Sequence, residues 1–205
     1  NPRLSIIIAT YNAAGTLEQC LASIFSQTYS NFEIIIADGL STDSTVSIIE
    51  KHNDSISHWH SHKDNGIYDA WNQAIEKSKG EYICFIGADD TFSDETALSR
   101  LFEKVATNKY DLISSKGLFL GFQKKHVIGN PWNHKKLSRR ITVCHPGLLH
   151  HRSLFERFGK FNTEYRIVGD YEFLLRLPAE TSSLHVDEIT MHIADGGVSR
   201  SRYLE

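Results

Sequence analysis

The sequence predicts an α/β fold in which a mostly parallel central sheet is flanked by helices. Three apolar runs, at residues 4–9, 32–37 and 82–86, lack strict alternation, as do parallel strands that are buried on both faces. Segments with apolar residues at helical spacing lie between these runs. Because the connections are short, we expect right-handed crossovers between neighbouring parallel strands.

The composition is that of an ordinary globular protein. The chain has 205 residues, of which 40% are hydrophobic and 23% charged, so it is long enough for one well-packed domain. Its net charge of −3 argues against nucleic acid as a partner. The three cysteines are far apart in apolar surroundings, which favours free thiols in a reducing compartment. No apolar stretch reaches membrane-spanning length.

The first half is expected to alternate strands and helices. The first strand leads to a helix over 17–25, and the strand at 32–37 leads to a helix near 46–49. A short strand over 57–62 and a helix over 67–78 precede the central strand, and Asp94 is expected to cap the next helix. No Gly-x-Gly-x-x-Gly motif follows the first strand, which argues against a dehydrogenase.

Three histidines alternate in the strand expected over 57–62, namely His58, His60 and His62. Side chains at this spacing span about 13 Å along a strand. We therefore do not expect the three to share one metal ion.

The pattern changes near residue 115. Separate strands are expected at 110–114 and 118–122, followed by a polar loop over 130–140. Short helices begin at Ser153 and Gly169, and a last strand is expected from residue 184. We interpret 1–205 as one domain, with a nucleotide-binding half at 1–114 and a partner-substrate half at 115–205 built onto the same sheet.

The central strand ends at two adjacent carboxylates, Asp89 and Asp90. Ligands of open α/β sheets bind at the carboxyl ends of the strands. Two ionised carboxylates repel each other unless a cation lies between them, and Mg²⁺ commonly binds one or two carboxylates plus substrate phosphates. A solvated turn or a helix cap would use the same residue types, so the pair alone leaves these alternatives open.

Five segments together resemble family 2 glycosyltransferases of the GT-A fold in order and spacing. They are residues 5–12, 38–43, 64–72, 87–90 and 169–172, and they extend over nearly the whole chain. The resemblance implies a Rossmann-like nucleotide-binding half and inverting transfer of a sugar from a nucleotide diphosphate sugar, with a UDP-sugar favoured. The acceptor would be a hydroxyl of a carbohydrate or a lipid-linked molecule, and the cofactor a divalent metal, Mg²⁺ or Mn²⁺.

The resemblance also implies roles for residues of the donor half. Thr10 and Tyr11, with Asn12 beside them, would line the nucleobase pocket, and Asp38 would accept a hydrogen bond from the base. Asp64 would lie close to the donor diphosphate or sugar.

Further residues of the resemblance concern the donor and the metal. Asp69 counts among the donor-binding residues, although its place in the first turn of a helix equally fits capping. Asp90 would ligate the metal directly, and Asp89 would contact the ribose or assist at the metal. His192, followed by residues 196–199, matches a histidine that approaches metal or diphosphate in some relatives, and a simple polar role is its alternative.

The catalytic base implied by the resemblance is Asp170, with Glu172 as the alternative. An alcohol has a pKa far above 7, so a carboxylate must take its proton as the new bond forms. Helix capping is the other interpretation of Asp170. His145 lies on the expected acceptor side, where an acceptor contact is one hypothesis.

Two departures from the family pattern limit the resemblance. Gly87 stands where the metal motif often begins with an Asp, and Ala88 follows it, so the ligand set is thin. The Gln-x-x-Arg-Trp signature of processive polysaccharide synthases is absent, which favours single-sugar transfer. A non-catalytic nucleotide-sugar-binding or scaffold protein therefore stays open. A nucleotidyltransferase is disfavoured because residues 13–16 form no glycine- and lysine-rich triphosphate loop.

By analogy with the family, we expect a bacterial, cytoplasmic enzyme of surface polysaccharide or glycolipid synthesis. Peripheral contact with the inner face of the membrane is an open alternative. A basic cluster of Lys135, Lys136, Arg139 and Arg140 fits a solvated loop as well as contact with an acceptor phosphate or an anionic membrane.

Overall fold

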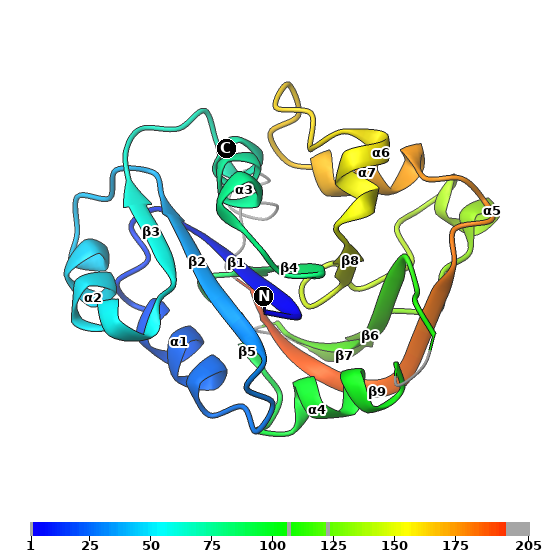
Figure 1. Cartoon of the computed structure of the whole chain (residues 1–205), viewed down its shortest axis with the longest axis horizontal. Coiled ribbons are helices and arrows are strands. Elements are labelled where there is room, and N and C mark those ends of the chain that lie inside the picture. The colour runs from blue at the N-terminus through cyan, green and yellow to red at the C-terminus, as the bar shows by residue number, and fades with distance from the viewer. Residues whose placement is uncertain (1, 106–107, 122–123, 196–205) are drawn as a thin grey trace.

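A single curled sheet forms the centre of the molecule, and helices cover both of its faces (Figure 1). The computed structural model describes residues 2–105, 108–121 and 124–195. The strands follow the order β3-β2-β1-β4-β8-β6-β9-β5, and β7 pairs with β6. The predicted α/β fold is therefore confirmed.

Apart from the short strand β5, which was not predicted, the elements of the first half follow the predicted order. The strands are β1 (Leu4–Thr10), β2 (Phe32–Asp38), β3 (His58–Ser61), β4 (Tyr82–Gly87), β5 (Thr91–Phe92), β6 (Leu112–Leu120), β7 (Lys125–Ile128), β8 (Leu149–His151) and β9 (Ser183–Ala194). The helices are α1 (Leu17–Phe25), α2 (Thr45–Lys51), α3 (Ile67–Lys77), α4 (Ala97–Glu103), α5 (His134–Leu137), α6 (Ser153–Phe158) and α7 (Gly169–Arg176), with a 3₁₀ turn at Asn53–Ser55.

The buried strands divide their side chains between two cores, one on each face of the sheet. Ile6 and Ile8 of β1 pack toward the face covered by α1 and α4, whereas Ile7 packs toward the face covered by α3, α6 and α7. Alternate residues of a strand point to opposite faces, and burial of both explains the nearly continuous apolar runs.

The second half differs from the prediction in three strands. The two strands expected at 110–114 and 118–122 are one strand, β6, whose pairing with β9 shifts register between Ser114 and Gly117. This irregularity interrupts the polar and apolar pattern, which made one strand look like two. The last strand likewise runs further than expected, and β7 was not predicted because its side chains are mostly exposed.

The polar loop expected over 130–140 contains a short helix, α5, which begins after Asn133. The side chain of Asn133 accepts a hydrogen bond from the backbone of Lys136 and so caps this helix. Among the described residues, no helix is both long and apolar enough to cross a membrane.

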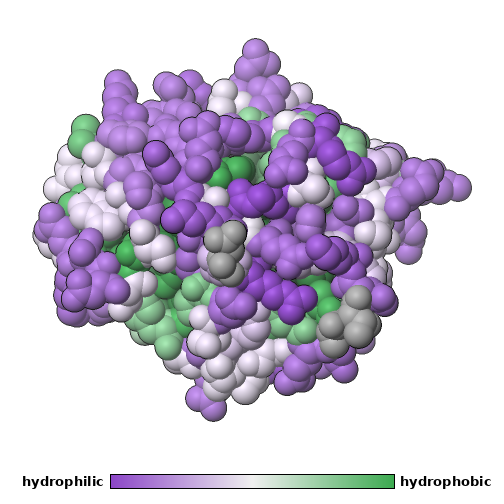
Figure 2. Space-filling model, viewed as in Figure 1, coloured by the Kyte–Doolittle hydropathy of each residue, from purple (hydrophilic) through white to green (hydrophobic). Residues whose placement is uncertain are grey.

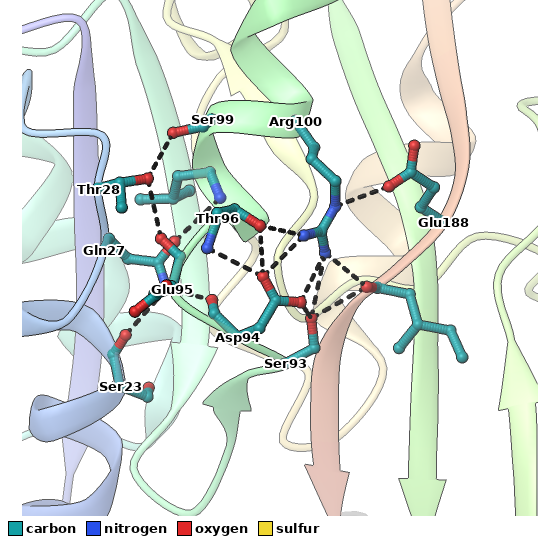
Figure 3. A network of polar contacts seen from close by, with 12 residues as sticks. Ser23, Gln27, Thr28, Ser93, Asp94, Glu95, Thr96, Ser99, Arg100 and Glu188 are labelled. Atoms are coloured by element: carbon teal, nitrogen blue, oxygen red, sulfur yellow. Dashed lines mark hydrogen bonds and ion pairs between the residues drawn. The ribbon is translucent and has the colours of Figure 1, made fainter.

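A network around Arg100 fastens α4 to β9 (Figure 3). Its guanidinium contacts both oxygens of Asp94, at 2.7 and 2.8 Å, and lies 2.7 Å from Glu188. Asp94 does not directly precede the helix as predicted, because α4 begins after Thr96. The Asp94 carboxylate instead accepts hydrogen bonds from the backbone and hydroxyl of Thr96, and so organises the turn before the helix.

We expect Asp94→Asn to lower the free energy of unfolding by about 1 kcal/mol at neutral pH, because both ion-pair partners are partly exposed. Hydrogen bonds from Arg100 hold the pKa of Asp94 well below its usual value, against the opposing effect of burial. A depressed carboxyl pKa stabilises the fold above the unfolded pKa of about 4, and this contribution is lost as the pH falls.

Urea unfolding at several pH values measures the effect. The difference between wild type and Asp94→Asn should be largest above about pH 5 and should shrink toward pH 2. Asp54→Asn, at an exposed position, is the control. A difference that stayed constant with pH would contradict the assignment.

Candidate functional site

The carboxyl ends of β1, β2 and β4 meet at one edge of the sheet and bring the candidate donor residues together. In the parallel register, Thr10 pairs with Asp38, and Asp38 pairs with Ser61 of β3. Ala9 pairs with Gly87, so the two carboxylates that follow β4 emerge at the same edge. This is the place where open α/β sheets bind ligands.

Asp38 is nearly fully buried, and hydroxyl and amide groups surround its carboxylate. One oxygen accepts from the hydroxyls of Thr10 and Ser41 at 2.8 and 2.5 Å, and the other accepts from Ser61 at 2.6 Å and the Ser41 amide at 2.9 Å. Burial would raise the pKa of Asp38, but these hydrogen bonds outweigh it and lower the pKa. A carboxylate has about four acceptor positions, so the predicted contact with a nucleobase requires one of these donors to move away.

Asn12 joins the loops that follow β1 and β2. Its backbone amide donates to the Ser41 hydroxyl at 2.8 Å, and its side-chain oxygen accepts from the Thr42 amide at 2.8 Å. Its φ of +50° lies in the left-handed region, which asparagine tolerates better than most residues. Tyr11 is 67% exposed beside it, so its ring is free to meet a flat ligand.

The Asp64 carboxylate lies against the backbone that follows Asp38. A Cβ atom added at Gly39 would lie 2.7 Å from an Asp64 oxygen, so a larger residue there would force the carboxylate to shift. Burial raises the pKa of Asp64, and the nearby charges of Asp69 and Asp38 add to the rise, while a hydrogen bond from Gly66 opposes it. Asp64 therefore lies at the same edge of the sheet as Asp38.

Asp69 takes part in the turn before α3. Its carboxylate accepts hydrogen bonds from the backbone and side chain of Asn65 at 3.0 and 3.1 Å. This is the capping role that the sequence left open, and the predicted donor contact of Asp69 stays a prediction.

Asp89 and Asp90 both fold back over Gly87. A Cβ atom at Gly87 would lie 2.6 Å from an oxygen of Asp89 and 2.9 Å from an oxygen of Asp90. Asp90 is 5% exposed and accepts backbone hydrogen bonds from Gly87 and Ala194. Burial and then the charge of Asp89 raise the pKa of Asp90 to about 7. A cation would relieve both effects, and the glycine that weakened the family resemblance makes room for the pair.

The residues at this edge fit a divalent ion that is shared with a substrate. In the described part of the chain, no three His, Cys, Asp or Glu side chains gather closely enough to hold a metal by themselves. Mg²⁺ is usually bound by one or two carboxylates together with substrate phosphates and water. Asp89 and Asp90 could supply the carboxylates.

His192 lies on β9. His192 pairs with Thr91, the residue after Asp90, so it lies on the neighbouring strand. Its role as a ligand stays a prediction, and residues 196–199 lie outside the described residues.

Asp170 lies in the first turn of α7, where side chains from two other segments contact its carboxylate. The Tyr68 hydroxyl of α3 is 3.0 Å from one oxygen, and the His145 Nδ1 atom is 3.8 Å from the other. Because Tyr68 is in the helix that follows Asp64, α3 connects the donor edge to the predicted base.

Glu172 is less available than Asp170 as a base. One of its oxygens lies 2.9 Å from the Arg176 guanidinium in the next turn, and the other is buried without a hydrogen bond among the described residues. A carboxylate engaged in an internal ion pair is a poor proton acceptor. The geometry favours Asp170.

Tyr68, Ser41 and Ser61 were not predicted as site residues. Tyr68 and Ser41 stand in segments that carry the family resemblance, and this was the available signal. The partners of Tyr68 and the Asp38 partner of Ser61 are distant in sequence, whereas Ser41 contacts Asp38 only three residues away. His145 is 4% exposed, which argues against the direct acceptor contact considered for it.

The basic cluster lies on and after α5. Lys135, Lys136, Arg139 and Arg140 are all exposed, and none of them makes an ion pair within the described part of the chain. Hydrophilic side chains project from the molecule at the edge where α5 lies (Figure 2). Exposed Ile141 follows directly, so the cluster has an apolar neighbour.

Comparison with known proteins finds a family model and relatives that match this chain. Residues 5–163 match the family model described as Glycosyl transferase family 2. A PGL/p-HBAD biosynthesis glycosyltransferase of Mycobacterium tuberculosis is 31% identical over 179 residues, which cover 85% of this chain and 69% of that protein.

Solved structures share the fold. TarS 1-349 of S. aureus, in complex with UDP-GlcNAc, has a TM-score of 0.81 at 18% identity, over 98% of this chain and 61% of that one. A Pyrobaculum calidifontis mannosyltransferase in complex with GDP-Man and Mn²⁺ has a TM-score of 0.72 at 19% identity, over 100% of this chain and 59% of that one. The chain thus spans about three fifths of both, and the predicted GT-A fold is confirmed.

We expect Asp38→Asn to destabilise the protein by about 1–3 kcal/mol, because an amide nitrogen would face a hydroxyl or amide donor that loses its acceptor. Chemical denaturation at neutral pH measures the change. Asp43→Asn is a matched control, since Asp43 also accepts hydrogen bonds, from Thr45 and from the Ala14 backbone, but is exposed. An equal loss of unfolding free energy in the two variants would show that burial adds nothing to the stabilisation that the hydrogen bonds of Asp38 provide.

Proposed function

Because the chain belongs to glycosyl transferase family 2, we propose that it transfers a single sugar from a nucleotide diphosphate sugar to an acceptor hydroxyl, with inversion and with assistance from Mg²⁺ or Mn²⁺. The observation that carries this proposal is the pair Asp89 and Asp90, folded over Gly87 at the sheet edge that also holds Asp38 and Asp64. A UDP-sugar is the first donor to test, since TarS is solved with UDP-GlcNAc.

The donor half would bind and orient the nucleotide. Tyr11 offers an exposed ring to the base, while Asp38 holds Thr10 and the Ser41 loop around the pocket. Asp89 and Asp90 would hold the divalent ion, which neutralises the negative charge that develops on a leaving diphosphate. Asp64 would face the diphosphate or the sugar.

Asp170 would act as the general base. It takes the proton from the acceptor hydroxyl as the oxygen forms its bond to the anomeric carbon, while the bond from that carbon to the diphosphate breaks. Attack from the face opposite the leaving group inverts the configuration at the anomeric carbon. We propose that residues 1–114 bind the donor and that residues 115–205 bind the acceptor and carry the base, although residue 115 itself lies within β6.

The acceptor would be a carbohydrate or a lipid-linked molecule. The mycobacterial relative's printed role in PGL/p-HBAD biosynthesis makes glycolipid acceptors the first to test. The exposed cations after α5 would suit an anionic lipid headgroup, in a cytoplasmic enzyme with peripheral contact to the inner membrane face. Tyr171 joins α7 to α5 by a hydrogen bond to Leu137, so the cluster is linked to the helix of Asp170.

Calorimetric titration tests the donor site. We expect one of UDP, GDP and dTDP to bind in the presence of Mn²⁺ and to lose at least about tenfold in affinity with EDTA, because Asp89 and Asp90 would hold the ion and the ion would offset the charge of the diphosphate. Asp90→Asn should bind the nucleotide weakly with or without Mn²⁺, whereas the exposed-site control Asp54→Asn should behave as wild type. Equal affinity with Mn²⁺ and EDTA would contradict the metal site.

Turnover tests the base. We expect Asp170→Asn to cut transfer by roughly 10² to 10⁴ while nucleotide affinity stays unchanged, because a general base typically contributes this much. The measurement is release of the nucleoside diphosphate with the donor found above. Wild-type turnover in Asp170→Asn would remove Asp170 from this role. A protein that binds the nucleotide but transfers nothing would support the alternative, a non-catalytic nucleotide-sugar-binding protein.

A further inference from the structure

The carboxylate of Asp170 lies between two aromatic side chains from different parts of the fold. Tyr68 of α3 places its hydroxyl 3.0 Å from Oδ1, and His145, from the segment before β8, places Nδ1 3.8 Å from Oδ2. Neither residue is used by the proposed chemistry.

His145 is fixed within a buried aromatic cluster. Its ring stacks on Trp71 and Phe85, with centroid distances of 5.6 and 6.1 Å, and lies 5.3 Å from the ring of His150. Burial lowers the pKa of His145, and the charge of Asp170 only partly opposes this. The imidazole is therefore neutral near pH 7. A neutral ring places its Nδ1 atom 3.8 Å from Asp170, beyond hydrogen-bond length, and brings no positive charge, which would weaken Asp170 as a base.

The Tyr68 hydroxyl has two acceptors within reach. It lies 2.5 Å from the Ile167 carbonyl and 3.0 Å from Asp170, and its single hydrogen can serve only one of them at a time. With Asp170 ionised, the hydrogen can point to the carboxylate. Once Asp170 has taken a proton, the hydrogen can turn to Ile167, and the Tyr68 oxygen can then accept from the protonated carboxyl.

Gly169 allows the Tyr68 ring to lie against the start of α7. A Cβ atom at Gly169 would come within 2.8 Å of two ring carbons of Tyr68. Any larger residue would push the ring away from the neighbouring Asp170. The close packing indicates that the Tyr68 contact is built into the helix start.

We propose that His145 and Tyr68 are positioning residues that hold the Asp170 carboxylate in the orientation required for proton abstraction. This inference rests on the proposed function, in which Asp170 is the base. Tyr68 would fix one oxygen through its hydrogen bond, and the polar contact with His145 would hold the other, so that lone pairs remain for the acceptor hydroxyl. Since preorganised geometry lowers the barrier without changing donor binding, the two residues should affect turnover rather than donor affinity.

The test uses variants that remove one donor each. His145→Phe keeps an aromatic ring in the cluster, His145→Asn keeps an N–H donor that cannot take a proton, and Tyr68→Phe removes one hydroxyl. Tyr171→Phe is the matched control, because the Tyr171 hydroxyl belongs to the neighbouring residue but donates to Leu137. Melting temperatures identify variants that are damaged by misfolding alone.

The first readout needs no substrate. The ¹³Cγ signal of Asp170, identified by its loss in Asp170→Asn, is followed against pH by NMR. Within residues 2–105, 108–121 and 124–195, Tyr68 and His145 are the titratable side chains in contact with Asp170, and His150 also faces His145. We expect the pH midpoint of this signal to move upward by about half a unit or more in His145→Phe and in Tyr68→Phe. Tyr68→Phe removes a hydrogen bond to the ionised form, and His145→Phe removes a polar nitrogen beside it. Tyr171→Phe should leave the midpoint unchanged.

The second readout is hydrolysis of UDP-GlcNAc by water with Mn²⁺, which needs a base but no identified acceptor. We expect kcat to fall about tenfold in His145→Phe and in Tyr68→Phe with KM unchanged, roughly the effect of one hydrogen bond, and His145→Asn to stay within about threefold of wild type. If UDP-GlcNAc is not turned over by wild type, the donor found by titration replaces it.

The outcomes separate the two proposals. Unchanged midpoints in both His145→Phe and Tyr68→Phe would overturn the positioning role, as would equal loss in His145→Asn and His145→Phe at wild-type melting temperature. If His145→Phe fails to fold, Tyr68→Phe decides. Shifted midpoints together with wild-type turnover in Asp170→Asn would instead refute the proposed base, while the contacts with Asp170 would stand.

Discussion

The in-register parallel pairing of β1, β2 and β3 is the constraint on which the donor edge depends. Thr10 and Ser61 are the register partners of Asp38 on either side, and the hydroxyls of both donate to its carboxylate. A slip of one residue would send these side chains to the opposite face and leave a buried carboxylate without donors. The apolar residues that pin the register in the core therefore also hold the polar site at the end of the strands.

A second constraint joins the two halves of the chain. Tyr68 of α3 contacts Asp170 of α7, and the stacked rings of Phe155 and Phe173, with centroids 4.8 Å apart, hold α6 and α7 together on the same face of the sheet. The aromatic cluster also encloses His145. Packing that is apolar in origin thus determines the surroundings of a carboxylate proposed to do chemistry, because a dry and rigid shell preserves its orientation.

Three glycines contribute room rather than an unusual backbone conformation. Gly39, Gly87 and Gly169 each lie where an added Cβ atom would come within 3 Å of a side chain that the site uses, and none of the three has a positive φ. Gly87 is the most instructive, since a glycine that departs from the family's usual acidic residue leaves room beside it for the carboxylates of both Asp89 and Asp90. The smaller ligand set is therefore compatible with a metal shared with substrate phosphates.

The sequence by itself determined the α/β class, the strands and helices of the first half, and the acidic residues after the strands, because buried parallel strands and their turns leave strong local patterns. It did not determine the continuity of β6, where an irregular register broke the pattern, nor β7, whose side chains are exposed. Only the tertiary structure decided that four donors surround Asp38 and that Tyr68 and His145 contact Asp170. Apart from the two donors of Ser41, which is three residues from Asp38, those contacts join residues distant in sequence, so packing and register create them and no local pattern records them.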